Sequence, residues 1–189
     1  MLDLCFVGLA NPGAKYDKTR HNIGKDWLIN LSQSYGATFQ LKQKYQAEIA
    51  YSHEEKIMWA IPENYVNNSG LTVEKIKKYT GLPYKKIIIF HDDLDLEPGE
   101  VKIKVNGGHA GHNGLKDIFQ KSGTKEFIRV RIGIGHPGDK SIMNSWVVKK
   151  FKPQEKVLIE KAYDNFVSVF DMICEQNISE ADRKSTRLN

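Results

Sequence analysis

The sequence predicts an α/β protein: a single-domain three-layer α/β/α sandwich around a twisted, mixed and mostly parallel central sheet. Short runs rich in β-branched residues alternate with amphipathic helical segments, which is the pattern of strand–helix–strand units. Residues 87–90 are strictly aliphatic or aromatic, as expected of a central parallel strand that is buried on both faces. The chain has 189 residues without an internal repeat, a length that suits one domain.

The first half of the chain contains four expected strands and one helix. A short apolar run predicts a strand at residues 4–7, and helical spacing of apolar side chains predicts a helix over residues 23–35. Alternation over residues 37–52 predicts half-buried strands, so we expect part of the sheet to be antiparallel. Residues 57–61 form the last strand before a polar loop.

The second half repeats this alternation. A helix ending at Gly81 precedes the central strand, and alternating apolar and lysine residues predict a strand at residues 101–105. The glycine-rich loop 107–114 leads into another helix, and residues 127–134 form a further strand. Pro153 suits the first position of the last expected helix, because its missing N–H has no partner there in any case.

The composition is that of a soluble globular domain. We assign residues 1–177 to this domain and interpret the polar, aperiodic residues 178–189 as a frayed tail. The longest apolar run is too short to cross a bilayer, and the N-terminus does not resemble a signal peptide. Cys5 and Cys174 lie in apolar segments, as expected of free thiols in a reducing compartment. We therefore expect a cytoplasmic protein, and a monomer because no long apolar stripe is left over.

Positive charge is concentrated in residues 101–152. The chain has a net charge of +5, and this segment alone holds eleven Lys and Arg against three acidic residues. A lysine-rich surface can simply be solvated, but such an excess beside a glycine-rich loop favours a polyanionic partner such as nucleic acid. Lys102 and Lys104 share one strand face beside that loop and are the expected phosphate contacts.

Polar side chains gather in four loops, three of which follow expected strands. These loops contain Asn11 with His21, Asn67, His91 with Asp92, and Asn113. Because the carboxyl ends of parallel strands meet at one edge of a sheet, we expect these groups to converge there. His21 can act as a general base near neutral pH, although its position also suits a residue that only caps the following helix.

The chemistry that these residues suit is general-base hydrolysis. A histidine beside a carboxylate is an orientable base, because the carboxylate selects the ring tautomer and stabilises the imidazolium. The sequence has no Gly-x-Ser-x-Gly elbow and both cysteines lie in apolar runs, so water is the expected nucleophile. Tyr16 and Tyr65 can stack on a nucleic-acid base, and asparagine amides can hold a peptide backbone.

Six motifs follow one another along the chain. They are Gly8-Leu-Ala-Asn-Pro-Gly, Thr19-Arg-His-Asn-Ile-Gly, Asn67-Asn-Ser-Gly, His91-Asp-Asp-Leu-Asp-Leu, Gly107-Gly-His-Ala-Gly-His-Asn-Gly-Leu-Lys and Arg131-Ile-Gly-Ile-Gly-His-Pro-Gly. In this order they resemble the bacterial-type peptidyl-tRNA hydrolase family, and the resemblance runs from the first strand to about residue 175. It departs at Val66, where the family often has methionine.

The resemblance implies hydrolysis of the ester that joins a peptide to the 3′ end of tRNA. It implies a catalytic group with His21 as the base and Asp92 as its support, together with Asn11 and Asn67. Asn11 would read the blocked amino end of the peptidyl-tRNA substrate. The residues expected to bind substrate or tRNA are Tyr16, Tyr65, Asn67, Lys102, Lys104, His112, Asn113 and Arg131. We expect neither a cofactor nor a metal.

Two other classes of function remain open at this point. His109 and His112, with the acids after the central strand, could form the site of a metal-dependent hydrolase, although their spacing is loose and no paired-His helix signature accompanies them. The loop 107–114 resembles a phosphate loop but lacks the Gly-Lys-Ser/Thr ending. The chain could also be a non-catalytic RNA-binding module, which would show no ester turnover.

Overall fold

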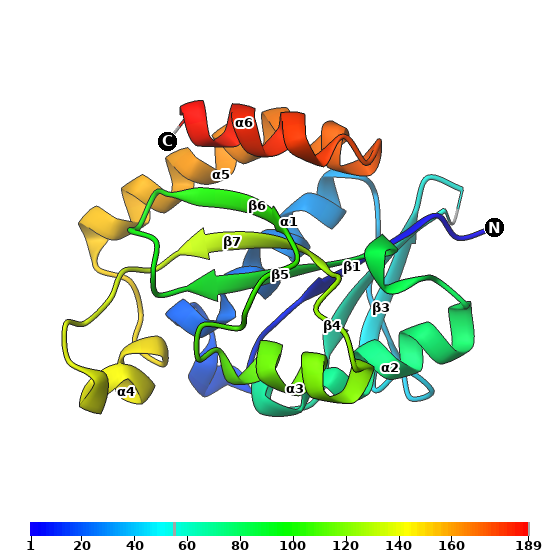
Figure 1. Cartoon of the computed structure of the whole chain (residues 1–189), viewed down its shortest axis with the longest axis horizontal. Coiled ribbons are helices and arrows are strands. Elements are labelled where there is room, and N and C mark those ends of the chain that lie inside the picture. Colours follow the sequence, from blue (N-terminus) through cyan, green and yellow to red (C-terminus); the bar gives the residue numbers. More distant parts are fainter. Residues whose placement is uncertain (55, 189) are drawn as a thin grey trace.

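A computed structural model describes residues 1–54 and 56–188 and contains one seven-stranded mixed sheet (Figure 1). The strand order is β2 (Gln40–Lys42), β3 (Ala47–Ser52), β4 (Ile57–Pro62), β1 (Leu4–Gly8), β5 (Ile87–Asp93), β7 (Ile128–Gly133) and β6 (Val101–Val105). Four neighbouring strands, β4, β1, β5 and β7, pair in parallel. Strands β2, β3 and β6 pair antiparallel with their neighbours.

Helices cover both faces of this sheet. They are α1 (Ile23–Ser34), α2 (Ser69–Thr80), α3 (Asn113–Ser122), α4 (Met143–Val147), α5 (Pro153–Cys174) and α6 (Ile178–Leu188). Alternate residues of a strand point to opposite faces, so Phe6 packs with α1 and α5 while Val7 packs with α2 and α3. The protein is therefore the expected three-layer sandwich, with a separate core on each side of the sheet.

The central strand is where the apolar pattern predicts it. All seven residues of β5 are buried, and β5 lies between the parallel strands β1 and β7. The alternating segment at residues 37–52 forms the antiparallel strands β2 and β3 at one edge, and α5 begins at Pro153 as expected. No helix of the described residues is long and apolar enough to span a bilayer.

The expectation of a frayed C-terminal tail is wrong for residues 178–188, which form α6 along β6 (Figure 1). Asp182 Oδ1 accepts a hydrogen bond of 2.8 Å from the backbone N–H of Ile103, and the Ser185 hydroxyl donates to the carbonyl of Val101 at 3.3 Å. An edge strand leaves such backbone groups open, and α6 satisfies them. Periodicity missed this helix because its buried stripe consists of small and polar residues, Ala181 and Ser185.

The short helix α4 is also absent from the sequence-based expectation. It follows β7 and lies beyond the ends of β5 and β7, away from the two main helical layers (Figure 1). Met143, Trp146 and Val147 are spaced as in a helix, but five residues are too few for periodicity to predict one.

Candidate active site

His21 reaches the edge of the sheet because α1 begins in direct contact with β5. A Cβ atom at Gly24 would lie 2.3 Å from the carbonyl oxygen of Phe90, so only glycine permits this approach. His21 belongs to a single 3₁₀ turn (Arg20–Asn22) immediately before α1. The close approach therefore carries its ring to Asp92, near the carboxyl end of β5.

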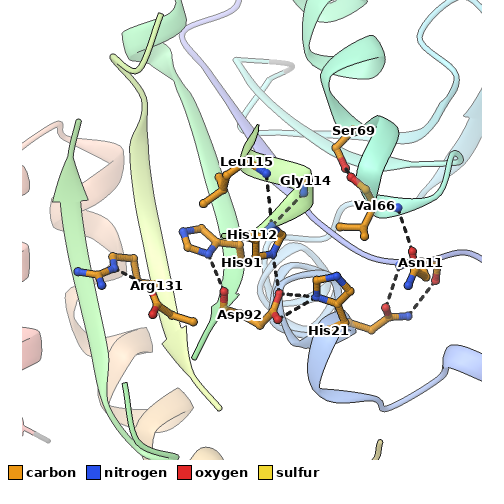
Figure 2. A network of polar contacts seen from close by, with 12 residues as sticks. Asn11, His21, Val66, Ser69, His91, Asp92, His112, Gly114, Leu115 and Arg131 are labelled. Atoms are coloured by element: carbon orange, nitrogen blue, oxygen red, sulfur yellow. Dashed lines mark hydrogen bonds and ion pairs between the residues drawn. The ribbon is translucent and has the colours of Figure 1, made fainter. Parts of the chain in front are cut away.

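Asp92 lies between two histidines (Figure 2). His21 Nδ1 is 2.9 Å from Asp92 Oδ1 and 2.8 Å from Oδ2, and His112 Nε2 is 2.8 Å from Oδ1. His112 also caps α3, where its Nδ1 accepts hydrogen bonds from the backbone N–H groups of Gly114 and Leu115. That nitrogen therefore carries no proton, and the proton of a neutral His112 lies on Nε2, which donates to Asp92.

The Asp92 carboxylate sets the protonation of His21. Burial lowers the pKa of His21, but the charge and hydrogen bond of Asp92 outweigh burial and raise that pKa above its usual value. Burial raises the pKa of Asp92, but the two histidines outweigh it and hold the carboxyl pKa far below its usual range. Asp92 is thus ionised at neutral pH, accepts the Nδ1 proton of a neutral His21, and leaves Nε2 as the basic nitrogen.

His91 is a third histidine in this network, and it remains neutral. Its Nδ1 donates to the backbone carbonyl of Asp92 at 2.8 Å, and its ring meets the ring of His112 edge-on at 5.3 Å. Burial and the neighbouring His112 lower the pKa of His91 to about 3. His91 therefore supports the side of His112 without adding a charge beside Asp92.

Asn11 is fastened through both its backbone and its side chain (Figure 2). The side chain of Asn22 accepts from the Asn11 N–H at 2.9 Å and donates to the Asn11 carbonyl at 3.0 Å. The backbone N–H of Val66 donates to Asn11 Oδ1 at 2.9 Å. Because the amide oxygen is engaged, Asn11 offers a ligand its NH₂ group, which is a donor.

Val66 begins the 3₁₀ turn Val66–Asn68 that presents Asn67. Its carbonyl accepts a 2.6 Å hydrogen bond from the Ser69 hydroxyl, and its side chain is buried. A Cβ at Gly114 would lie 3.0 Å from Val66 Cγ2, so the two loops pack closely here. The buried Val66 side chain therefore fills the space beside the start of α3.

Two cavities include His21 in their walls. One, of about 270 Å³, is also lined by Asn11, Tyr65, Asn67 and Asn113, which are expected catalytic or substrate residues. The other, of about 80 Å³, is lined by His21 together with Asp92, His91 and His112. Both cavities take part of their wall from α4. The structure thus brings the four asparagine and histidine loops together, as the sequence predicted.

The two tyrosines expected to stack on bases lie beside this site. Tyr65 is 54% exposed and lines the larger cavity, and the ring of Tyr16 meets it edge-on with centroids 6.2 Å apart. An exposed aromatic face next to a general base is suited to stacking on a terminal nucleotide.

A basic row, formed by Arg129 and Arg131 of β7 and Lys102 and Lys104 of β6, extends from beside the neutral His91 to the edge of the sheet. His91, Arg131 and Lys102 are register partners on β5, β7 and β6, and Lys104 opposes Arg129 one step further along. Neighbouring strands are about 4.8 Å apart, so the Lys102 backbone lies ~10 Å from that of His91. Like charges directly opposite on an antiparallel pair repel, so these positions favour an anion between them.

The two arginines of this row are more constrained than the lysines. Arg131 Nε is paired with Asp93 Oδ2 at 2.8 Å, and Arg129 is 3% exposed and donates to the carbonyl of Asn106 at 2.9 Å. Lys102 and Lys104 are exposed. The lysines are therefore the accessible members of the row.

His21, Asp92 and His112 also form the one group of potential metal ligands found among the described residues, with ligand atoms within 4.8 Å of one another. A metal needs an unprotonated imidazole nitrogen, whereas His112 Nε2 carries its proton while Nδ1 caps α3. Binding would require moving that proton and breaking the cap. The hydrogen-bonded arrangement therefore does not fit a metal, and His109 lies outside the group.

Sequence reasoning missed three contributors to the site. Asn22 and Arg20 flank His21 in the same motif, and their adjacency was the available signal. Asn144 in α4 lines both cavities, but it lies in a helix of five residues, which is too short for periodicity to predict. The role of Arg20 depends on contacts across 130 and 135 residues, whereas Asn22 contacts Asn11, which is 11 residues away.

The fold and the site define a hydrolase with a three-layer sandwich fold, in which a carboxylate-oriented histidine lines a cavity at the carboxyl edge of the sheet. The described residues that line the two cavities include no serine or cysteine, which is consistent with water as the nucleophile.

The chain belongs to the peptidyl-tRNA hydrolase family. The family's sequence profile, described as peptidyl-tRNA hydrolase, matches residues 5–189. Peptidyl-tRNA hydrolase from Shewanella halifaxensis is 41% identical over 178 residues, covering 93% of this chain and 92% of the relative. The protein of the same name from Rickettsia bellii is 39% identical over 183 residues, covering 96% and 98%.

Solved structures agree with this assignment. The crystal structure of peptidyl-tRNA hydrolase from Acinetobacter baumannii superimposes with a TM-score of 0.93 at 33% identity, covering 98% of this chain and 96% of that one. A peptidyl-tRNA hydrolase complex with n-propanol gives the same values. The predicted family and fold class are confirmed.

Proposed function

We propose that this chain hydrolyses the ester between a peptide and the 3′ end of tRNA, using water activated by His21. The observation that carries the proposal is the hydrogen bond from His21 Nδ1 to Asp92, which leaves Nε2 basic in a ring that lines the larger cavity. Nε2 accepts a proton as the water oxygen attacks the ester carbonyl carbon. The bond from that carbon to the ribose oxygen then breaks, and the ribose oxygen receives the proton from His21.

Asn11 would distinguish the blocked amino end of the substrate. Its NH₂ group can donate to the carbonyl oxygen of an N-acyl group, whereas a free ammonium is itself a donor and offers no acceptor. Burying that charge without a partner is unfavourable by several kcal/mol. Asn67 and Asn113, which line the same cavity, are suited to hold the junction between peptide and ribose.

The tRNA would extend from the cavity across the basic row. Lys102 and Lys104 would contact phosphates, with Arg131 behind them, and Tyr16 and Tyr65 would stack on the terminal base. We propose a monomeric enzyme, because each group assigned to this site is supplied by the same chain. We propose that it acts in the cytoplasm, where bacterial translation produces peptidyl-tRNA.

The test is single-turnover hydrolysis of N-acetyl-aminoacyl-tRNA beside the same aminoacyl-tRNA with a free amino group. We expect rapid release of tRNA from the acetylated substrate only, and a loss of ~10²–10⁴-fold in His21→Ala. His53→Ala is the matched control, because His53 is an exposed histidine in the turn between β3 and β4. Full activity of His21→Ala would overturn the assigned base, and equal turnover of both substrates would overturn the role of Asn11.

A further inference from the structure

Arg20, the residue immediately before His21, is a buried arginine with partners at the start of α5. Its side chain is 2% exposed. Nη1 donates to the carbonyl of Lys150 at 2.9 Å, and Nη2 is 2.8 Å from Glu155 Oε2. Full burial of an arginine is rare unless it is paired, so the guanidinium occupies a specific position between two segments.

The same guanidinium stacks on the C-terminal part of α4. Its carbon lies 3.7 Å from the centre of the Trp146 ring, and Trp146 Nε1 in turn donates to the carbonyl of Gly135 at 3.0 Å. The backbone N–H of Arg20 donates to the carbonyl of Lys149 at 3.0 Å. The loop of the general base is thus joined to the segment 146–155 by a backbone hydrogen bond, a cation–π contact and an ion pair.

The segment that Arg20 holds is also a wall of the active site. Met143, Asn144 and Val147 of α4 line the smaller cavity, and Asn144 and Val147 line the larger one. α4 is short, and none of its residues is fully buried, although Trp146 and Val147 pack against the edge of the core. The contacts of Arg20 add polar and charged restraints to this limited apolar packing, and they join α4 directly to the turn that carries the His21 ring.

We propose that Arg20 is a positioning residue for hydrolysis: it fixes His21 relative to α4, so that the ester is held against the basic nitrogen. The proposal rests on the proposed function of His21 as the base. Arg20 touches neither the cavities nor the reacting atoms, and it acts through the ring of His21 and the wall formed by α4.

The first test compares kcat and KM for a short N-acyl-aminoacyl ester in the wild type and in a variant of Arg20. Arg20→Lys keeps the charge but loses the planar fork and the stack on Trp146. Misplacement of a reacting group by about 1 Å costs up to ~10²-fold, so we expect kcat to fall at least about tenfold, with a smaller change in KM. Arg183→Lys on α6 is the matched control, because Arg183 forms an exposed pair with Glu180.

Glu155 provides a second test that leaves the catalytic loop unchanged. Both Arg20 Nη2 and the backbone N–H of Lys152 donate to the same oxygen, Oε2. The amide oxygen of Glu155→Gln can accept both bonds, whereas Glu155→Ala can accept neither. We expect kcat to fall several-fold in Glu155→Ala and less in Glu155→Gln, with both proteins folded at the assay temperature by circular dichroism.

The third test distinguishes positioning from a general loss of stability. If Arg20 acts through His21, adding Arg20→Lys to His21→Ala should leave the residual rate unchanged, because the base is already absent. A stability defect alone would instead lower the residual rate in proportion to the folded fraction. The imidazole NMR signals of His21 should broaden or shift in Arg20→Lys, while those of the exposed His53 stay unchanged.

The proposal is overturned if folded Arg20→Lys or, where that variant does not fold, folded Glu155→Ala retains the wild-type kcat. It is also overturned if the losses of Arg20→Lys and His21→Ala multiply fully. These outcomes are separate from failure of the proposed function, which would appear as full activity of His21→Ala itself.

Discussion

At the scale of single residues, the two carboxylate oxygens of Asp92 bind the rings of two histidines, His21 and His112. Oδ1 is shared by His21 and His112, and Oδ2 approaches His21 alone. A buried carboxylate that accepts two N–H groups from separate loops fixes the positions of both loops. The same carboxylate that raises the pKa of His21 therefore also holds the start of α3 against the site.

Asp92→Asn should lower kcat and move the acidic limb of the rate–pH profile to lower pH. The base works only when neutral, and the carboxylate raises the pKa of His21. An amide in place of the carboxylate lowers the pKa of His21, so His21 becomes neutral at a lower pH. The uncharged amide also stabilises the imidazolium less well than the carboxylate does, so kcat falls. Single-turnover rates measured from pH 5 to 9 test both effects.

The double variant Asp92→Asn with His21→Ala supplies the control. Members of one catalytic unit are not additive, so its rate should hardly fall below that of His21→Ala alone. Fully multiplicative losses would show that Asp92 acts independently of His21.

Activity should survive removal of metal ions. The proton on His112 Nε2 prevents this nitrogen from acting as a ligand, and the base at His21 Nε2 needs no Lewis acid. Dialysis against a chelator should leave the single-turnover rate within about twofold, a change well below the effect of removing a general base. A loss that zinc or magnesium restores would contradict this mechanism.

At the scale of elements, α6 stabilises the open edge of the sheet. The N–H of Ile103 donates to Asp182, and the residues of α6 that face β6 are buried although they are small or polar. Helix α6 therefore protects β6 from pairing with another chain more by satisfying its backbone than by burying apolar surface.

Asp182→Ala should lower the free energy of unfolding by about 1–3 kcal/mol, because it leaves a partly buried N–H without an acceptor. The matched control on the same helix is Glu180→Ala, which removes exposed pairs with Arg183 and Lys184. Exposed pairs contribute about 0–1 kcal/mol. Urea denaturation of both variants measures the difference, and equal midpoints would show that the Asp182 bond contributes nothing beyond surface charge.

At the scale of the whole molecule, the basic row and the catalytic residues meet near the carboxyl ends of β5 and β7. The basic row starts at Arg131, the register partner of the neutral His91 on β5, and ends on the exposed edge strand β6. A polyanion bound along this row would present its end to the cavity. The lysines would then contribute to binding affinity, whereas the cavity residues would act on the end of the same substrate.

Lys102→Ala with Lys104→Ala should raise KM for the tRNA substrate and reduce the salt slope of binding by roughly one unit for each phosphate that a lysine no longer neutralises. A short N-acyl ester should be unaffected, because it does not reach the row. Lys77→Ala with Lys78→Ala, at the far end of α2, is the matched control. A similar change for both substrates would mean that the lysines act on stability rather than on phosphate.

The amino-acid sequence by itself determined the layers of this protein and the identity of its central groups. Apolar periodicity reports whether each segment is buried on one face or two, so β5, the antiparallel edge and α5 could be predicted from their own residues. His21 and Asp92 could be named because their side-chain chemistry and their motifs are local properties. The convergence of their loops followed from the rule that parallel strands end at one edge.

Only the tertiary structure decided which groups meet. His112 could be placed near the site, but its role as the second donor to Asp92 depends on packing between segments 20 residues apart. Arg20 donates a hydrogen bond to Glu155, which is 135 residues away in the sequence, and Asp182 accepts one from the N–H of Ile103, which is 79 residues away. Local patterns cannot report such partners, because each contact forms only after the sheet has brought distant segments together, and small or polar residues such as those of α6 leave no hydrophobic signal in the sequence.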